Sequence, residues 1–393
     1  MKKITLFAFI GSNNLGDEAI FYSIISTLIK NGYFINVLSF NPKKTNSVIY
    51  KFPKSQFRIF NAKNPFHNIK AIRDCDLFLC GGGGIIQDGT SIYNLPRYLS
   101  IIILANFLNK KIMLYGVGAG PIYSSVSKLI VGKILCLVDL ITVRDKKSKE
   151  LLINCGVKGD IIKITADPAI SLKKSFINGG TYYKSKYKKK KIIICLRHWF
   201  DINRLVPVNI AKKLHIQSKG DKIKQANFVK EFSNFLNYCQ NNLEFQLIFL
   251  PFWKERDNKI HKEVIDNLID SKGVIMINRG MHPIEATRYI SKADILIGMR
   301  LHSIILAVAN RIPFIGLTYS QKVNNFLDLV LPKNLLHNFS LEVENISSRD
   351  LINSLNFLIK SNYFQSRKFN KKLKNLLAKE KSNFKLMEKL LNE

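Results

Sequence analysis

Short runs of apolar residues alternate along the chain with longer amphipathic segments. A run of about four to eight apolar residues is typical of a strand buried on both faces, whereas apolar residues spaced three and four apart predict a helix. In residues 1–170 the runs predict strands at 4–10, 35–40, 76–80, 111–117, 140–143 and 161–165. Amphipathic segments between them predict helices at 18–30, 98–108 and 124–138. This alternation indicates a parallel sheet covered on both faces.

The alternation stops at residues 173–191, KKSFINGGTYYKSKYKKKK. This segment has no apolar periodicity, a Gly-Gly pair and a run of lysines, which is typical of a linker. A second alternating set follows it. Its predicted strands lie at 191–197, 245–251, 273–278, 294–299 and 312–317, and its predicted helices at 226–242, 257–270, 283–291 and 302–310.

We therefore predict an α/β protein with two doubly wound, Rossmann-like domains that face a central cleft. The N-terminal domain is expected at 1–172, the Lys-rich linker at 173–191, the C-terminal domain at 192–345 and a C-terminal helical segment at 346–393. Apolar residues repeat along one face of that last segment, so we expect it to pack against a domain, with a membrane surface as the alternative. Ligands of doubly wound sheets bind at the carboxyl ends of the strands.

Composition supports two globular domains and adds a strong positive charge. The chain has 393 residues, of which 47% are hydrophobic, so large cores are expected and a disordered chain is excluded. The formal net charge of +33 suggests nucleic acid or an anionic membrane surface as partners. However, the lysines are spread along the whole chain and no nucleic-acid-binding motif is present, so no nucleic acid is expected. Two explanations of the charge stay open: it attracts phosphorylated substrates electrostatically, or it reflects a compositional bias of the sequence.

The six cysteines form no CxxC pair and no zinc-type cluster with histidines, so we expect reduced thiols and no metal site. The apolar N-terminal run is short and lacks a signal-peptide cleavage site, which favours a first strand. The longest apolar stretches fall short of the roughly 20 residues that a membrane span needs. We expect a cytoplasmic protein, with peripheral contact at the inner face of the membrane as a further option.

Two segments of the first domain place polar or flexible residues after predicted strands. The segment GSNNLGDEAI (11–20) follows the first strand and opens a helix, so Asn14 and Asp17 either form a capped turn or contact a ligand. It matches neither a dinucleotide-binding nor a phosphate-binding loop motif. We interpret its two polar side chains as candidate acceptor ligands.

The second segment is the glycine-rich CGGGGIIQDGTS (80–91). A loop with four glycines lets the backbone approach a ligand closely, which makes Gly83 and Gly84 candidate binding positions. Asp88 follows in the same segment and is a candidate base for a hydroxyl group. Three further segments, YGVGAGPI (115–122), RDKKS (144–148) and TADPAI (165–170), are also expected at the strand ends of this sheet.

The second domain places cationic side chains at its predicted strand ends. Arg197 ends the first strand, Arg300 follows the strand at 294–299, and His302 lies at the start of the helix at 302–310. Arginine is rarely buried without a partner, and the beginning of a helix favours anions. These residues therefore indicate a pocket for a small ligand with phosphate and carboxylate groups. The alternative is a structural ion pair of Arg300 with Asp294 or Glu285.

Together these segments resemble the polysaccharide pyruvyl transferase family. The matching stretches span residue 11 to about 320 and are GSNNLGDEAI, CGGGGIIQDGTS, GVGAGPI, TVRDKKS, ADPAI, CLRHW and GMRLHSIILA. The resemblance implies a GT-B-like fold and transfer of a pyruvyl group from phosphoenolpyruvate to a sugar, with formation of a ketal. It also implies that the donor is bound by Arg197, Arg300, Leu301 and His302.

A mechanism follows as a hypothesis. Arg197 and Arg300 hold the phosphate and carboxylate of phosphoenolpyruvate, His302 neutralises phosphate or supplies a proton, and Asp88 or Asp17 deprotonates the acceptor. No metal or cofactor is expected, because arginines can supply the electrostatic stabilisation. The acceptor is expected to be a glycan or a lipid-linked glycan of the cell surface. The alternatives are a GT-B glycosyltransferase that uses a nucleotide sugar, and a basic glycan- or nucleic-acid-binding protein without turnover.

Overall fold

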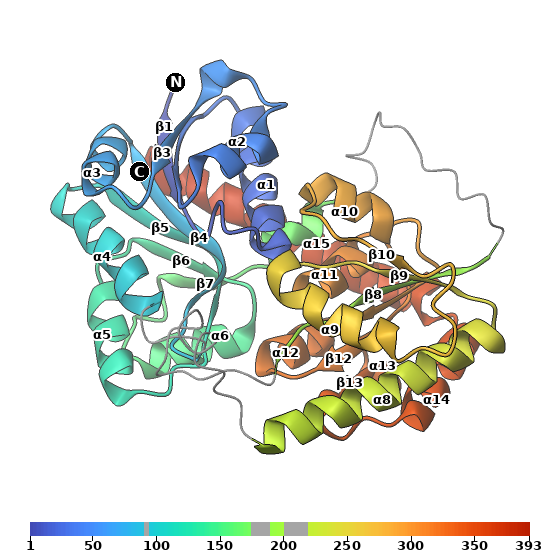
Figure 1. The fold of residues 1–393 in the computed structure, drawn as a ribbon. Coiled ribbons are helices and arrows are strands. Elements are labelled where there is room, and N and C mark those ends of the chain that lie inside the picture. The colour runs from blue at the N-terminus through green and yellow to red at the C-terminus, as the bar shows by residue number, and fades with distance from the viewer. Residues whose placement is uncertain (90–93, 174–188, 200–218) are drawn as a thin grey trace. The chain divides into compact units, whose positions relative to one another are not determined.

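The chain folds into two compact units, each built on one parallel sheet. The computed structural model describes residues 1–89, 94–173, 189–199 and 219–393 (Figure 1). The described part of the first unit comprises residues 1–89, 94–171 and 375–393, and the described part of the second lies within 172–374. Most of the predicted Lys-rich linker, residues 174–188, lies outside the described part of the chain. The predicted central cleft between the domains stays a prediction.

The first unit contains a sheet of seven parallel strands in the order β3-β2-β1-β4-β5-β6-β7. The strands are β1 (Lys3–Phe7), β2 (Phe34–Ser39), β3 (Phe57–Asn61), β4 (Leu77–Ile86), β5 (Lys111–Ala119), β6 (Leu140–Val143) and β7 (Ile162–Ile164). The helices are α1 (Leu15–Lys30), α2 (Pro42–Ile49), α3 (Pro65–Arg73), α4 (Asn94–Phe107), α5 (Ser125–Leu135) and α6 (Lys146–Asn154), with short 3-10 helices at Lys54–Gln56 and Pro168–Ser171. One core cluster joins the sheet to buried side chains of α3, α4, α5 and α6.

The second unit contains a sheet of six parallel strands in the order β10-β9-β8-β11-β12-β13. The strands are β8 (Lys191–Cys195), β9 (Gln246–Phe249), β10 (Ile275–Met276), β11 (Ile295–Gly298), β12 (Phe314–Thr318) and β13 (Ser340–Glu342). The helices are α8 (Lys219–Asn241), α9 (Lys254–Asp266), α10 (Pro283–Ile290), α11 (Leu301–Ala309), α12 (Gln321–Val330), α13 (Lys333–Phe339) and α14 (Ser348–Lys360), with 3-10 helices at Val343–Asn345 and Tyr363–Gln365. The predicted fold of two doubly wound α/β domains is confirmed.

Every predicted strand is present, and two further strands, β3 and β13, were not predicted. Both lie at the edge of their sheets. An edge strand is covered less completely than a central one, so it needs no continuous apolar run. The sequence of β3, FRIFN, is interrupted by the exposed Arg58, and β13 is only 3 residues long. Neither segment therefore shows the pattern that identifies the central strands.

The four glycines of residues 81–84 lie within β4, which corrects the prediction of a loop after residue 80. β4 continues to Ile86 and pairs with β5, with a shift of register between Gly83 and Ile86. Close packing explains two of the glycines. A β-carbon on Gly81 would lie 2.5 Å from the carbonyl oxygen of Tyr115, and one on Gly82 would lie 2.0 Å from Cγ2 of Ile20. The glycines thus let α1 and β5 approach β4.

Helix α15 (Arg367–Asn392) joins the two units, because residues 375–393 belong to the first and the residues before them to the second. The residues of the predicted helical segment at 346–393 are thus divided between the two units. Within the first unit, Asn383 accepts a hydrogen bond from the Thr165 hydroxyl (2.7 Å) and donates one to the carbonyl oxygen of Ala166 (3.1 Å). The apolar face of α15 is buried, which favours packing over the membrane alternative; its buried residues include Phe369, Leu373, Leu376, Met387 and Leu391. Among the described residues, no helix is both long and apolar enough to cross a membrane.

The packing of Gly82 leads to a stability prediction. Gly82→Ala should destabilise the protein by about 2–4 kcal/mol, because the new methyl group would overlap Ile20 and the backbone φ of +78° disfavours a side chain. Gly84→Ala is the matched control, since the nearest atom to its β-carbon is 3.9 Å away. Urea denaturation measures both variants. Equal stability of the two would contradict this packing.

Candidate anion-binding site

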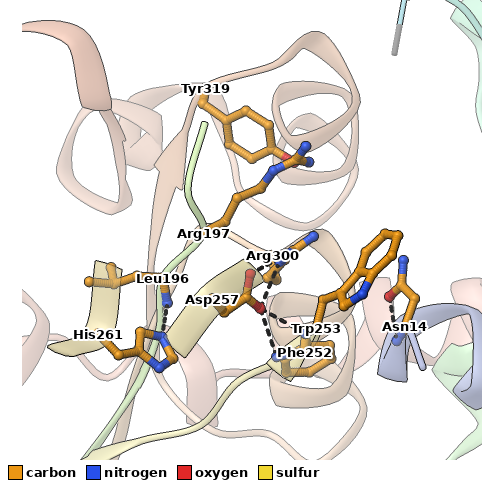
Figure 2. A network of polar contacts seen from close by, with 10 residues as sticks. Asn14, Leu196, Arg197, Phe252, Trp253, Asp257, His261, Arg300 and Tyr319 are labelled. Carbon is orange, nitrogen blue, oxygen red and sulfur yellow. Dashed lines mark hydrogen bonds and ion pairs between the residues drawn. The ribbon is translucent and has the colours of Figure 1, made fainter. Parts of the chain in front are cut away.

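Three neighbouring strands of the second unit end next to one another and place polar side chains at their carboxyl ends. The parallel order β8-β11-β12 brings together Arg197, which follows β8, Arg300, which follows β11, and Tyr319, which follows β12. Figure 2 shows these side chains with Asp257 and Trp253. The sequence correctly placed the two arginines at strand ends, and the structure brings them to the same edge of one sheet.

Asp257 is the buried partner of Arg300. Its carboxylate has no exposed surface and pairs with the Nε and Nη2 groups of Arg300, whose side chain is 10% exposed (Figure 2). Oδ2 of Asp257 lies 3.1 Å from Nε of Arg300, and the same oxygen accepts hydrogen bonds from the backbone N–H groups of Phe252 (2.9 Å) and Trp253 (2.8 Å). One carboxylate thus fixes the loop before α9 and orients the guanidinium.

The ion pair predicted as the alternative therefore exists, but with another acid. Asp294 accepts a hydrogen bond from the backbone N–H of Lys191 (2.7 Å), and Glu285 pairs with Arg279. Asp257 was missed because it lies in the first turn of a helix, 43 positions before Arg300 in the sequence. No local pattern connects the two residues.

Arg197 and Tyr319 form a second contact at this edge. Nη1 of Arg197 donates a hydrogen bond of 2.6 Å to the phenol oxygen of Tyr319, and the guanidinium carbon lies 4.8 Å from the ring centroid. Burial alone would raise the pKa of Tyr319, but the positive charges of Arg197, Lys322 and Arg300 outweigh it and lower the pKa to about 7. Tyr319 was not predicted as a site residue, although it lies two positions after the strand predicted at 312–317 and directly follows the observed β12.

Arg256 adds a third guanidinium to the site. Its guanidinium carbon lies 3.8 Å from the ring centroid of Trp253. Burial and the positive charges of Arg197 and Arg300 lower the pKa of Arg256 to about 10, and the charge of Asp257 only partly opposes them. The charges of Arg197 and Arg300 thus act on Arg256, and the carboxylates of Asp257 and Glu255 oppose them. Arg256 was also missed by the sequence analysis.

The remaining predicted donor residues lie at the start of α11. Arg300 is the N-cap of this helix, and His302 is half-buried in its first turn. The Leu301 side chain is buried in the core, so only its backbone N–H is suited to contact a ligand. The helix dipole adds partial positive charge at the same point. The structure therefore gathers Arg197, Arg300, Leu301 and His302 as predicted, although no observation yet tests their role.

His261 is a structural histidine beneath this site. It is fully buried, and its Nε2 accepts a hydrogen bond of 3.2 Å from the backbone N–H of Leu196 (Figure 2). Burial lowers the pKa of His261 to about 4, so the ring is neutral at physiological pH. It fixes the backbone between β8 and Arg197.

The predicted acceptor residues of the first unit lie at the start of α1 and in β4. Asn14 is the N-cap of α1, and its side-chain oxygen accepts a hydrogen bond of 3.1 Å from the backbone N–H of Gly16. Asp17 is half-buried, and one of its carboxylate oxygens lies 2.8 Å from the position of a β-carbon on Gly83. Gly84 is exposed. Asp17, Gly83 and Gly84 therefore lie close together, with Asn14 at the start of the same helix.

Asp88 has a different environment from the one predicted. Its carboxylate is 3% exposed and accepts hydrogen bonds from the backbone N–H groups of Tyr123 (2.9 Å) and Ser124 (3.1 Å). These bonds fix the turn that leads into α5. Since both oxygens are engaged by the backbone, the geometry argues against Asp88 as a base or an acceptor ligand, and Asp17 is the better candidate.

Glu18 is a buried acid that the sequence analysis overlooked. Its Oε1 accepts hydrogen bonds from the backbone N–H groups of Gly11 (2.8 Å) and Ser12 (3.1 Å), whereas Oε2 has no partner among the described residues. Burial raises its pKa to about 7. Glu18 therefore supports the loop of residues 11–14 that precedes α1.

Two more of the predicted strand-end segments meet through a buried ion pair. Nη1 of Arg144, which follows β6, lies 2.8 Å from Oδ2 of Asp167, which follows β7. Arg144 is 8% exposed, and a β-carbon on Gly118 would lie within 2.6 Å of its guanidinium. Gly118 of the YGVGAGPI segment thus makes room for the Arg144 side chain. Among the described residues there is no group of three or more His, Cys, Asp or Glu side chains that could hold a metal ion.

The Asp257–Arg300 pair leads to a second prediction. Asp257→Asn should destabilise the protein by about 3–5 kcal/mol, because it leaves a buried guanidinium without its counter-charge. Asp266→Asn is the matched control, since Asp266 is exposed on the same helix. Chemical denaturation gives both free energies of unfolding. A loss below about 1 kcal/mol for Asp257→Asn would contradict the assigned role.

Comparison with known proteins identifies one matching family and several solved structures with a similar fold. The sequence profile of a family described as "Polysaccharide pyruvyl transferase" matches residues 14–321. No curated protein sequence matches the chain significantly. Among solved structures, UDP-GlcNAc 2-epimerase from Neisseria meningitidis bound to UDP-GlcNAc is 15% identical, with a TM-score of 0.61 over 100% of both chains.

Two other solved structures have the same fold. The S. aureus MnaA–UDP structure is 13% identical, with a TM-score of 0.62 over 100% of this chain and 98% of that one. The Anabaena protein HepE in complex with UDP is 11% identical, with a TM-score of 0.60 over 99% and 100% of the chains. At these identities the likeness concerns the fold alone, and it confirms the GT-B-like class.

Proposed function

The chain belongs to the polysaccharide pyruvyl transferase family and is a transferase, and from this we propose that it moves a pyruvyl group from phosphoenolpyruvate to a sugar. The product is a ketal across two hydroxyls of a cell-surface glycan or its lipid-linked precursor. In this proposal the second unit binds the donor and the first unit binds the acceptor. The reaction is proposed to take place in the cytoplasm, with peripheral contact at the inner face of the membrane.

The excess of positive charge at the strand ends of the second unit is the observation that carries this proposal. The positive charges of Arg197 and Arg300 act on both Arg256 and Tyr319, and the charge of Lys322 also acts on Tyr319. The buried Asp257 is the main negative charge that acts on Arg256. Phosphoenolpyruvate supplies a phosphate and a carboxylate within one small molecule. Arginine binds both groups through paired N–H donors, so the ligand matches the site in charge and in geometry.

The proposed chemistry begins at the carbon–carbon double bond of the donor. A proton adds to carbon 3, and carbon 2 becomes electrophilic as its oxygen supplies electrons. One acceptor hydroxyl then attacks carbon 2, with Asp17 as the proposed base. The second hydroxyl then attacks carbon 2 as the bond to phosphate breaks; its proton passes to the departing phosphate, and the ketal closes. His302 neutralises the departing phosphate or supplies a proton, and Arg197 and Arg300 stabilise the developing negative charge. No step of this scheme requires a metal or cofactor.

Use of a nucleotide sugar is the competing function. The solved structures with this fold include complexes of UDP-GlcNAc and UDP with other enzymes, and a cluster of arginines also suits a diphosphate. Thermal unfolding of the protein with phosphoenolpyruvate, UDP-sugars and GDP-sugars separates the two functions. Stabilisation by phosphoenolpyruvate alone supports the proposal, and stabilisation by a nucleotide sugar alone overturns it.

The proposed function leads to a third prediction. Wild-type protein with phosphoenolpyruvate and a sugar acceptor should release inorganic phosphate and add the mass of a pyruvyl ketal to the acceptor. Arg300→Ala and His302→Ala should each lower the rate of phosphate release by about 100- to 10,000-fold, because each removes charge stabilisation or proton transfer. Circular dichroism checks that the variants are folded.

Arg279→Ala is the matched control for these variants. Arg279 lies in the same unit but is exposed and pairs with Glu285. Its loss should leave the rate of phosphate release unchanged. Full activity of both Arg300→Ala and His302→Ala would contradict the donor site.

A further inference from the structure

Helices α4 and α5 of the first unit expose an unusual number of large apolar side chains. The two helices pack against each other beside the first sheet (Figure 1). One face of each helix is in the core, through residues such as Leu99, Ile102, Val131 and Leu135. The exposed side of each helix also carries large apolar residues, among polar and basic ones. We define the α4–α5 face by its exposed residues Ile103, Phe107, Val126, Leu129 and Ile130, which are 45%, 78%, 65%, 58% and 42% exposed.

The exposed apolar residues recur at the regular spacing of a helix face. In α5, Val126, Leu129 and Ile130 recur at intervals of three and four positions, so they form one stripe on the solvent side of the helix. In α4, Ile103 and Phe107 are four positions apart and share a side in the same way. A solvent-facing helix surface of a soluble protein is normally polar, and a large exposed apolar patch marks an interaction site.

The charge of the same helices points to the kind of partner. The sequences of α4 and α5 contain Arg97, Lys128 and Lys133 and no Asp or Glu. Lys128 and Lys133 are exposed beside the apolar stripe of α5. An apolar stripe bordered by lysines is the pattern of a helix that lies in the interface of an anionic bilayer. With 14 and 11 residues, neither helix is long enough to cross a bilayer.

We propose that the α4–α5 face is the surface with which this protein binds an anionic membrane. Its apolar side chains enter the boundary between headgroups and acyl chains, while Lys128 and Lys133 contact anionic headgroups. This inference rests on the proposed function and extends it, because it places the membrane contact on the unit that is proposed to bind a lipid-linked acceptor. It also replaces α15 as the membrane-binding element, since the apolar face of α15 is buried.

Vesicle sedimentation with the full-length protein tests this surface and forms a fourth prediction. Wild-type protein should sediment with vesicles of phosphatidylglycerol and phosphatidylethanolamine and much less with phosphatidylcholine vesicles. The double variant Leu129→Gln/Ile130→Gln should lose at least about tenfold in vesicle affinity, because it removes apolar area that the membrane buries on binding. Lys128→Gln/Lys133→Gln should weaken the preference for the anionic vesicles and its dependence on salt.

Ile269→Gln is the matched control, because Ile269 is 81% exposed in the second unit and should not contribute. Wild-type affinity of Leu129→Gln/Ile130→Gln would overturn the proposal. So would a wild-type protein that ignores vesicles and forms a dimer that this double variant makes monomeric, since the face would then bind a second copy. The assay needs no turnover, so its outcome is distinguishable from a failure of the proposed pyruvyl transfer.

A second, independent inference concerns Tyr319. Its phenol oxygen lies 2.6 Å from Nη1 of Arg197, the guanidinium that is proposed to bind the donor. In phosphoenolpyruvate the carboxylate, the phosphate-bearing oxygen and carbon 3 are all attached to carbon 2. In this proposal, the anion of the donor binds Arg197 on the side that faces Tyr319, so that carbon 3 lies next to the phenol. Arg197, Lys322 of α12 and Arg300 are the charged groups that act on Tyr319, and together they lower its pKa to about 7.

We propose that Tyr319 is the catalytic acid that protonates carbon 3 of the donor, which rests on the proposed function. The phenol O–H bond breaks and its proton forms the new C–H bond with the electron pair of the carbon–carbon double bond. The phenolate that remains is stabilised by Arg197. It regains a proton from the acceptor hydroxyl, through the base, once that hydroxyl has added to carbon 2. His302 is then left to the departing phosphate.

The fifth prediction tests this role. Tyr319→Phe keeps the ring on Arg197, so phosphoenolpyruvate binding measured by calorimetry should stay within about threefold, while kcat should fall by about 100- to 10,000-fold. In the wild-type enzyme kcat/KM should decrease as pH rises through about 7, because the phenol loses its proton, and the variant should lack this decrease. Calorimetry in buffers of different ionisation enthalpy should show proton uptake when the donor binds to the wild-type protein near pH 7, and none with the variant.

Tyr289→Phe is the control, since Tyr289 lies beside Arg279 outside the site. A kcat of Tyr319→Phe within about threefold of the wild-type value would overturn this role, as would a defect in donor binding alone. A wild-type protein that releases no phosphate from phosphoenolpyruvate would instead reject the proposed function, and this assignment with it.

Discussion

The buried carboxylate of Asp257 is the interaction on which the site of the second unit depends. It pairs with Arg300 and accepts hydrogen bonds from the backbone of Phe252 and Trp253, so one group fixes the loop before α9 and the guanidinium after β11. The guanidiniums of Arg197 and Arg300 also act on Arg256, and the carboxylates of Asp257 and Glu255 oppose them. In the proposed function, an anionic donor relieves the repulsion between these guanidiniums.

The pKa values of Arg256 and Tyr319 are lowered for partly different reasons. Burial, followed by the charges of Arg197 and Arg300, lowers the pKa of Arg256, whereas positive charges lower the pKa of Tyr319 against the effect of its burial. In the proposed function, a donor with two anionic groups binds among these charges, at the strand ends where ligands of doubly wound sheets bind.

The sequence was sufficient for the fold and for part of the site because both depend on local patterns. Central strands are continuous apolar runs, and Arg197, Arg300 and His302 follow such runs directly. The glycines of β4 show the limit of this reasoning, because their spacing suggested a ligand loop, whereas Gly81 and Gly82 are explained by contacts with Tyr115 and Ile20. Asp257 could not be identified from the sequence for a related reason. It meets Arg300 through the packing of α9, and no regular spacing in the sequence connects the two residues.

Asp88 and the α4–α5 face show the same limit in the first unit. Asp88 has the residue type and position of a base, but the backbone of the turn before α5 occupies both of its oxygens. The sequence predicted helices at 98–108 and 124–138, but only the structure separates the apolar residues of α4 and α5 that are buried from those that are exposed. In both cases the side chain was recognised and its environment was not.

A crystal structure of the protein with phosphoenolpyruvate bound tests the central claim most directly. The account predicts that the phosphate and the carboxylate of the donor contact Arg197 and Arg300 at the carboxyl ends of β8 and β11, beside the start of α11. A donor bound at the first unit, or a second-unit site that accepts only a nucleotide sugar under the same conditions, would contradict it.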